Sequence, residues 1–269
     1  MTDLEPVLRI VPSPGDALSL QNTKNTGVLQ MTVRTFVAAA AAVIVGLSAA
    51  AAGAEELRVA ATPVPHADIL KLIEPDLKKD GYDLKIVEFS DYVSPNLALD
   101  AGEVDANYYQ HKPFLDAAVE HRRLKIASVA PIHILPMAAY SKKVKKITDL
   151  ADGASVTIPN DPANGGRALL LLEDAGLLKL KPGIGVKATV LDIVSNPKHL
   201  RIREVEAAQV PRTLDDVDLA VVNSNYAIGV GLNPVTDSIY LESKTSPYAV
   251  VGALSLIHIS EPTRPRLIS

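Results

Sequence analysis

The chain has 269 residues, of which 48% are hydrophobic and 22% charged, with 31 acidic against 27 basic side chains. This composition is typical of a globular protein of one or two domains, and a net charge of -4 offers no basic surface for nucleic acid. The sequence contains no cysteine, which excludes disulfides, cysteine-ligated zinc, iron–sulfur clusters and lipid attachment through cysteine.

The N-terminal part has the pattern of an export signal. Residues 1–30 show no sustained hydrophobic period and are expected to be a non-native or upstream extension. Residues 31–54 combine the basic Arg34, the apolar run 36–47 and small residues suited to signal cleavage. The apolar run is shorter than the roughly 20 residues that a membrane span needs. We therefore expect a signal peptide, with Met31 as the true start.

From Leu57 onward, strand and helix patterns alternate. The first unit is a strand over 57–62, a helix over 67–80 and a strand over 83–89, which is a βαβ signal. Further helices are expected over 95–101, 112–124, 166–178 and 211–217, and further strands over 103–109, 154–159, 189–194, 200–206, 218–223 and 238–243.

The long apolar stretch 125–140 contains two prolines and predicts a strand that leaves one sheet and enters another. The sequence therefore predicts an α/β protein of two lobes joined by crossing strands. In such folds the ligand site lies at the carboxyl ends of strands, between the lobes.

Aromatic residues are rare in the chain, yet several gather in one short region around His111. They fall at expected strand ends and loops, where ligand-contacting residues occur. A pocket is one interpretation, and ordinary core packing is the alternative. The aromatic residues of this region are Phe89, Tyr92, Tyr108, Tyr109 and Phe114.

A second polar concentration lies in IPNDPANGGRALLLL, residues 158–172. Asn160 or Asp161 can cap a helix, and the glycines that follow allow close backbone approach. Arg167 then predicts an anion site at the helix N-terminus, because the helix end carries partial positive charge and arginine binds carboxylates through two parallel hydrogen bonds. Alternatively, Arg167 faces solvent and the glycines form a turn. No nucleotide-binding glycine motif is present.

Catalytic patterns are weak. The sequence has no GxSxG motif and no histidine spacing typical of metal ligands. The enzymatic alternative is a secreted α/β enzyme that uses His111 with Asp105 or Asp116. We expect a binding protein instead, with no metal and no cofactor.

Four runs, residues 88–99, 102–116, 158–181 and 215–227, resemble the methionine-binding (MetQ/NlpA-type) substrate-binding proteins of ABC importers. The resemblance covers about residues 57–250. It implies a two-lobed periplasmic-binding-protein fold, type 2-like, that closes on L- or D-methionine or a related amino acid and delivers it to a membrane permease with its ATPase. It also implies a periplasmic protein, which we expect to be a monomer. Another hydrophobic amino acid or a short peptide is the alternative ligand.

The same resemblance assigns the site. Four residues correspond to the family's side-chain pocket, one to the arginine that holds the ligand carboxylate, and two to polar partners of the ligand's backbone groups. In that order, these residues are Tyr92, Tyr109, His111 and Phe114, then Arg167, then Asn164 and Asn223.

Two departures from the family are visible. Many relatives carry a lipid-attachment cysteine after the signal peptide, and its absence here predicts a soluble periplasmic protein. Relatives usually have Asn two residues after the SPY-type motif, whereas SPYAVV places Val250 there. This exchange removes one expected hydrogen bond to the ligand and leaves the ligand's identity open.

The resemblance also sets the expected domain boundaries. Residues 55–138 with 244–254 form the first lobe, whose C-terminal part is truncated, and residues 139–243 form the second. Residues 255–269 are expected to be an artefactual tail, because SLIHISEPTRP resembles the translation of a sequencing-adapter read-through. In relatives a last helix packs on the first lobe, and we expect it to be missing here. The expected consequence is an exposed apolar face on that lobe.

Overall fold

The computed structural model describes residues 54–243 and 246–256. The expected extension 1–30, nearly all of the expected signal peptide 31–54 and the tail beyond residue 256 lie outside the described residues. Within the described part, no helix has the length and apolar character needed to cross a membrane.

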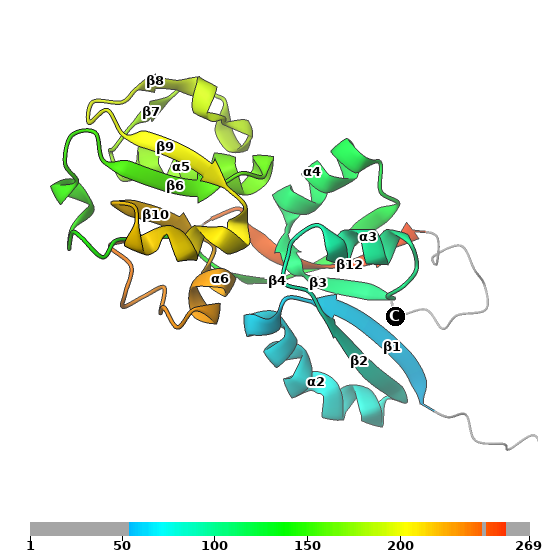
Figure 1. Cartoon of the computed structure of the whole chain (residues 1–269). Coiled ribbons are helices and arrows are strands. Elements are labelled where there is room, and N and C mark those ends of the chain that lie inside the picture. Colours follow the sequence, from blue (N-terminus) through cyan, green and yellow to red (C-terminus); the bar gives the residue numbers. More distant parts are fainter. Residues whose placement is uncertain (1–53, 244–245, 257–269) are drawn as a thin grey trace, which may run out of the picture. The chain divides into compact units, whose positions relative to one another are not determined.

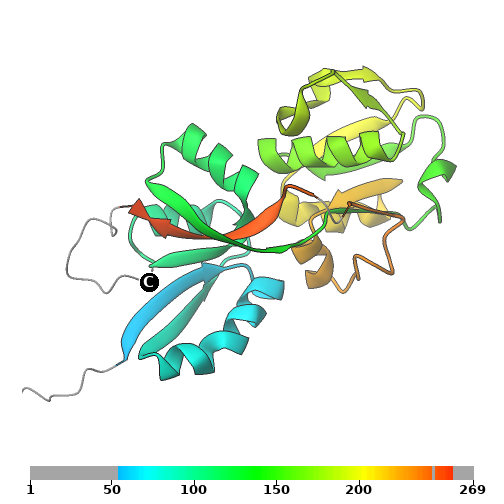
Figure 2. The same cartoon turned by 180° about the vertical axis from the view of Figure 1, so that it is seen from behind.

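The first sheet has the strand order β2-β1-β3-β12-β4. β1, β2 and β3 run parallel, whereas β12 is antiparallel to both β3 and β4. Helix α2 covers one face, and α3 and α4 lie on the other (Figure 1; Figure 2). The elements are β1 (Glu55–Ala61), a π-helical turn (Pro63–Ala67), α2 (Asp68–Lys79), β2 (Tyr82–Glu88), α3 (Ser94–Asp100), β3 (Ala106–His111), α4 (Lys112–Arg122), β4 (Ile126–Ile134) and β12 (Ala249–Ser255).

The second sheet has the strand order β11-β5-β10-β6-β9, in which β10, β6 and β9 are parallel. Its elements are β5 (Ala138–Tyr140), β6 (Ser155–Pro159), α5 (Pro162–Asp174), β9 (Arg201–Val205), the 3-10 helix η5 (Ala207–Asp215), β10 (Leu219–Val222), α6 (Ser224–Gly229) and β11 (Tyr240–Leu241). A two-stranded sheet of β7 (Lys179–Leu180) and β8 (Ile193–Ser195) and the short 3-10 helices η2 (Ile147–Asp149), η3 (Gly185–Lys187) and η4 (Val190–Asp192) complete the described part.

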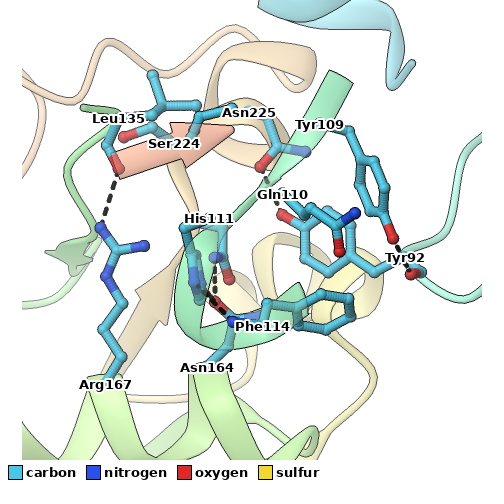
Figure 3. Close-up of a pocket in the computed structure, with 12 residues that line it drawn as sticks. Tyr92, Tyr109, Gln110, His111, Phe114, Leu135, Asn164, Arg167, Ser224 and Asn225 are labelled. Atoms are coloured by element: carbon cyan, nitrogen blue, oxygen red, sulfur yellow. Dashed lines mark hydrogen bonds between the residues drawn. The ribbon is translucent and has the colours of Figure 1, made fainter. Parts of the chain in front are cut away.

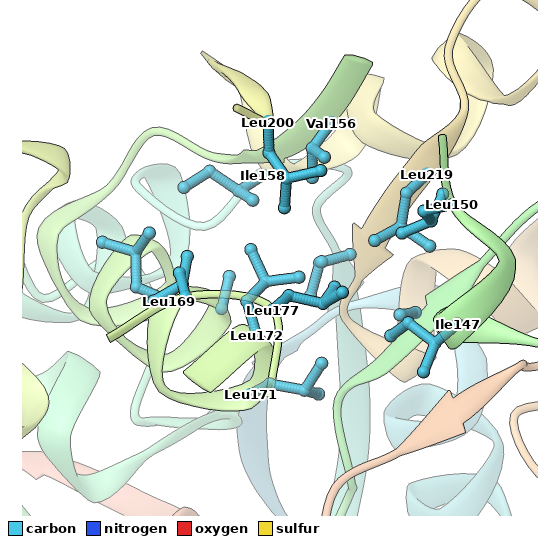
Figure 4. Packing of buried hydrophobic residues seen from close by; sticks show 14 of the residues in the cluster. Ile147, Leu150, Val156, Ile158, Leu169, Leu171, Leu172, Leu177, Leu200 and Leu219 are labelled. Atoms are coloured by element: carbon cyan, nitrogen blue, oxygen red, sulfur yellow. The ribbon is translucent and has the colours of Figure 1, made fainter. Parts of the chain in front are cut away.

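Both sheets bury side chains on both faces, which explains their continuous apolar strands. In β1, Val59 and Ala61 pack on the side of α2, whereas Ala60 packs with α3 and α4. In the second sheet, Leu169 and Leu172 of α5 are fully buried against the strands (Figure 4). Burial of one leucine side chain contributes about 1.5–3 kcal/mol, so α5 is held mainly by this apolar stripe.

The alternating α/β pattern and the crossing of the stretch 125–140 from one sheet to the other are confirmed. The chain crosses between β4 and β5, and again between β11 and β12. β12 lies between β3 and β4, inside the first sheet, and includes Ser255. The expected helix 211–217 is a 3-10 helix that begins earlier, at Ala207, and the expected strand 189–194 is mostly a 3-10 turn before β8.

The helix expected over 166–178 begins four residues earlier. Asp161 caps it by accepting the backbone N–H of Asn164, and Pro162 occupies the first helical turn. The glycines of the motif therefore lie inside α5 rather than in a loop. A Cβ on Gly166 would lie only 2.4 Å from the backbone oxygen of Val186, so this glycine allows α5 to pack on the protein's own chain.

In the described part of the chain, apolar side chains of the edge strand β4 are exposed. Val129 and Ile132 of this strand are 48% and 54% exposed. Both side chains lie beside Gly252 of β12, where a Cβ would meet them at 3.5 and 3.7 Å.

Gly166→Ala should destabilise the protein, because the new methyl group meets rigid backbone and α5 must shift. We expect a loss of about 1–3 kcal/mol in the free energy of unfolding, measured by urea denaturation. Gly229→Ala is the matched control, since nothing lies within 4 Å of its Cβ position. Equal stabilities of the two variants would contradict the packing role of Gly166.

Candidate ligand-binding pocket

A small cavity, with about 20 Å³ of enclosed free space, lies beyond the carboxyl ends of β3, β6 and β10. This space is about enough for one water molecule, so the side chains that line the cavity fill most of it in this arrangement. All seven residues that the sequence assigned line it, most of them labelled in Figure 3. The full lining is Tyr92, Tyr109, Gln110, His111, Phe114, Leu135, Asn164, Arg167, Asn223, Ser224, Asn225 and Val250.

One wall of the cavity is aromatic. The ring of Tyr92 lies 6.0 Å from that of Tyr109, 5.6 Å from that of Phe114 and 4.8 Å from that of Tyr226. The Tyr92 hydroxyl donates to Asn225 Oδ1 at 2.5 Å, and the Tyr109 hydroxyl donates to the backbone oxygen of Tyr92 at 2.8 Å. Burial raises the pKa of both phenols, so this wall is uncharged at neutral pH.

His111 caps helix α4 and is a neutral imidazole. Its Nδ1 accepts the backbone N–H of Phe114 at 3.1 Å, so the proton lies on Nε2, which donates to Asn164 Oδ1 at 3.0 Å. Burial, with a further contribution from the charge of Arg167, lowers its pKa to about 3. His111 therefore keeps Asn164 oriented without adding charge to the pocket.

The enzymatic arrangement considered from the sequence is wrong in its geometry. Asp105 accepts from the backbone N–H of Arg58, and Asp116 pairs with Lys112. Both ring nitrogens of His111 are bonded elsewhere, so neither carboxylate orients it. Across residues 54–243 and 246–256, no group of three or more His, Asp or Glu side chains is placed to hold a metal ion.

The two asparagines leave one acceptor open. Asn164 Nδ2 donates to the Asp161 carboxylate at 2.9 and 3.1 Å, and Asn164 Oδ1 accepts from Asn223 Nδ2 at 2.7 Å. Asn223 is 7% exposed, and its Oδ1 has no hydrogen-bond partner in the described part of the chain. A buried amide oxygen without a partner is costly, and an ammonium group in the cavity would satisfy it.

Arg167 is almost fully buried, at 3% exposure, and is held by a carboxylate of the chain itself. Its Nε donates to Glu242 Oε1 at 2.9 Å, and its Nη2 donates to Glu242 Oε2 at 2.5 Å and to the backbone oxygen of Leu135 at 2.9 Å. The guanidinium carbon also lies 4.3 Å from the centre of the Tyr248 ring, in cation–π contact.

This geometry corrects the predicted anion site. The two parallel hydrogen bonds of Arg167 are present, but they go to Glu242. Arg167 lies in the second turn of α5, and the carboxylate at the helix N-terminus is the capping Asp161. Of the two terminal nitrogens of the guanidinium, Nη2 is therefore occupied by Glu242 and Leu135. Only Nη1 is left without a hydrogen bond to the described part of the chain.

Sequence reasoning missed several residues of the site. Asn225 lies two positions after Asn223 in NSNY, so the polar run itself was a usable signal. Glu242 is 75 positions from Arg167, and nothing in its local sequence marks it as a partner. The other lining residues that were not assigned are Gln110, Leu135, Ser224 and, as a ligand contact, Val250.

The two-sheet fold with its pocket is that of a periplasmic substrate-binding protein. The chain belongs to the NlpA lipoprotein family, whose model matches residues 57–255. It is similar to a nutrient-binding protein from Burkholderia cenocepacia bound to methionine, with 47% identity and a TM-score of 0.74, covering 77% of this chain and 87% of that one.

Two curated relatives show the same relationship. The chain is 52% identical over 173 residues to the D-methionine-binding lipoprotein MetQ of Salmonella typhimurium, covering 64% of each. It is 50% identical over 184 residues to the protein of the same name from Escherichia coli K12, covering 68% of this chain and 67% of that protein. The chain thus spans slightly less than two thirds of the Salmonella relative's length.

The state of His111 is testable through the pH dependence of stability. Its folded pKa of about 3 lies below the usual 6.5, so the unfolded chain binds the proton first and stability is lost as the pH falls from 6.5 toward 3. His111→Gln should reduce this loss by at most about 1.4 kcal/mol per pH unit in urea unfolding between pH 7 and 4. If the free energy of unfolding has the same pH dependence in the variant and in the wild type, the pKa of His111 is not lowered by folding.

Proposed function

We propose that the chain is a substrate-binding protein that captures methionine, as the L- or D-isomer, or a related amino acid, and delivers it to an ABC importer. Its partners are the membrane permease and the ATPase of that importer, and it acts without catalysis. Ligand shifts the equilibrium between open and closed arrangements of the two lobes, and the permease recognises the closed form.

This proposal rests on the pocket having separate groups for a carboxylate, an ammonium group and an apolar side chain. Arg167 supplies a cation for a carboxylate, and the unpartnered Oδ1 of Asn223 supplies an acceptor for an ammonium group. Tyr92, Tyr109 and Phe114 form an aromatic wall for an apolar side chain. A thioether packs well against aromatic rings, at roughly 0.3–1.5 kcal/mol per contact, which favours methionine. The names of the relatives support the same ligand.

We further propose that the protein acts in the periplasm as a monomer. The proposed lobes are residues 55–138 with 244–254, and residues 139–243. The arrangement of the strands supports this division, because the first sheet uses strands between Glu55 and Ile134 together with β12, and the second uses strands between Ala138 and Leu241.

Isothermal titration calorimetry with L-methionine, D-methionine and a panel of other amino acids tests the ligand. We expect at least one methionine isomer to bind with a Kd of about 1 μM or tighter, near -8 kcal/mol. Tighter binding of another hydrophobic amino acid, or of a short peptide, would move the assignment to that ligand. No heat with any amino acid or short peptide from a folded sample would refute the proposal.

Val250→Asn tests the departure at the SPY-type motif. Val250 is buried and lines the cavity, so an amide there supplies a further donor and acceptor for the ligand's backbone groups. We expect methionine affinity to rise by about 0.5–1.5 kcal/mol in calorimetry. Val250→Ala is the control, because it changes the shape without adding a hydrogen bond. If both variants bind equally, position 250 does not contact the ligand's polar groups.

A further inference from the structure

Arg167 is the one cationic side chain among the described residues that line the cavity, and its charge is matched from within the chain. The side chain of its partner, Glu242, is itself only 12% exposed. Because a buried guanidinium without a counter-charge is strongly unfavourable, this ion pair allows the cavity to hold Arg167 before any ligand is present.

Glu242 is fixed in turn by the chain segment that crosses between the sheets. Its Oε2 accepts the backbone N–H of Met137 at 3.0 Å, and its own N–H donates to the backbone oxygen of Met137 at 2.9 Å. Arg167 Nη2 donates to Leu135 of the same segment (Figure 3). One edge of the guanidinium, Nε and Nη2, is therefore fully used, and no residue of the described part of the chain bonds Nη1.

We propose that Glu242 is a positioning and specificity-determining residue of this pocket, an inference that rests on the proposed function. It holds Arg167 so that a ligand carboxylate meets Nη1 alone, and it offsets the arginine's charge. A ligand with a carboxylate only is repelled by Glu242, whereas one that also carries an ammonium group gains attraction that offsets the repulsion. The carboxylate of Asp161, which caps α5 and binds Asn164, likewise repels a ligand carboxylate and attracts a ligand ammonium group. The pocket thus selects zwitterions over simple anions.

Calorimetry on the full chain with three ligands that share one side chain tests this inference. L-methionine carries both charges, 4-(methylthio)butanoate lacks the ammonium group, and L-methioninamide lacks the carboxylate. Glu242→Gln keeps the size of the side chain but removes its charge. We expect the preference for methionine over 4-(methylthio)butanoate to shrink by about tenfold or more, and the binding of methioninamide to weaken.

Two further variants separate charge from structure. Glu173→Gln removes a carboxylate from α5 that accepts the backbone N–H of Leu180, away from the pocket, and should leave the preference unchanged. Glu242→Asp keeps the charge but shortens the reach, so it should keep the preference while weakening both ligands. This variant decides the question if Glu242→Gln does not fold.

The outcomes distinguish the two proposals. If wild-type protein binds no methionine, the proposed function fails. If it binds methionine but folded Glu242→Gln shows the wild-type preference within about threefold, Glu242 does not set specificity and this inference alone is overturned. Wild-type affinity for both ligands in Glu242→Asp would also overturn it, because the position of Arg167 would not then depend on Glu242. Arg167→Ala is less informative, since it leaves Glu242 buried without its partner.

Discussion

The buried ion pair of Arg167 and Glu242 is the interaction on which the pocket depends. The guanidinium of an arginine that is only 3% exposed needs a counter-charge and hydrogen-bond acceptors in its immediate surroundings. Glu242 supplies the charge, Leu135 supplies a backbone oxygen, and the ring of Tyr248 covers one face. These partners come from the two chain crossings between the sheets, so the same bonds that hold the arginine also tie α5 to the crossing segments.

The rest of the pocket adds dipoles rather than charge. His111 is neutral because burial lowers its pKa to about 3, and its single N–H orients Asn164. Asn164 in turn orients Asn223 through a hydrogen bond. The Oδ1 of Asn223 accepts no hydrogen bond from the described part of the chain and can accept one from a ligand. The buried tyrosines are neutral phenols bonded to partners within the protein. A zwitterion therefore meets one positive site, one open acceptor and an apolar wall.

Much of this arrangement was predictable, because local patterns dominate where the sheets are regular. The βαβ unit from β1 to β2 followed from hydrophobic periodicity, and the motif around Arg167 marked a helix beside the pocket. The start of α5 was missed because consecutive glycines favour a loop, and the close approach of Gly166 to the 186–188 backbone compensates for their low helix propensity. Glu242 could not be predicted, since its role comes from a contact 75 residues away.

A crystal structure of the protein with methionine bound would show whether Glu242 keeps its hydrogen bonds to Arg167 when the ligand is present. We expect the ligand carboxylate to lie about 2.7–3.2 Å from Arg167 Nη1 and the ligand ammonium to lie within the same distance of Asn223 Oδ1, while Glu242 still binds Nε and Nη2. A ligand carboxylate that displaces Glu242 and takes both of its hydrogen bonds would show that Glu242 does not hold Arg167 in the liganded protein.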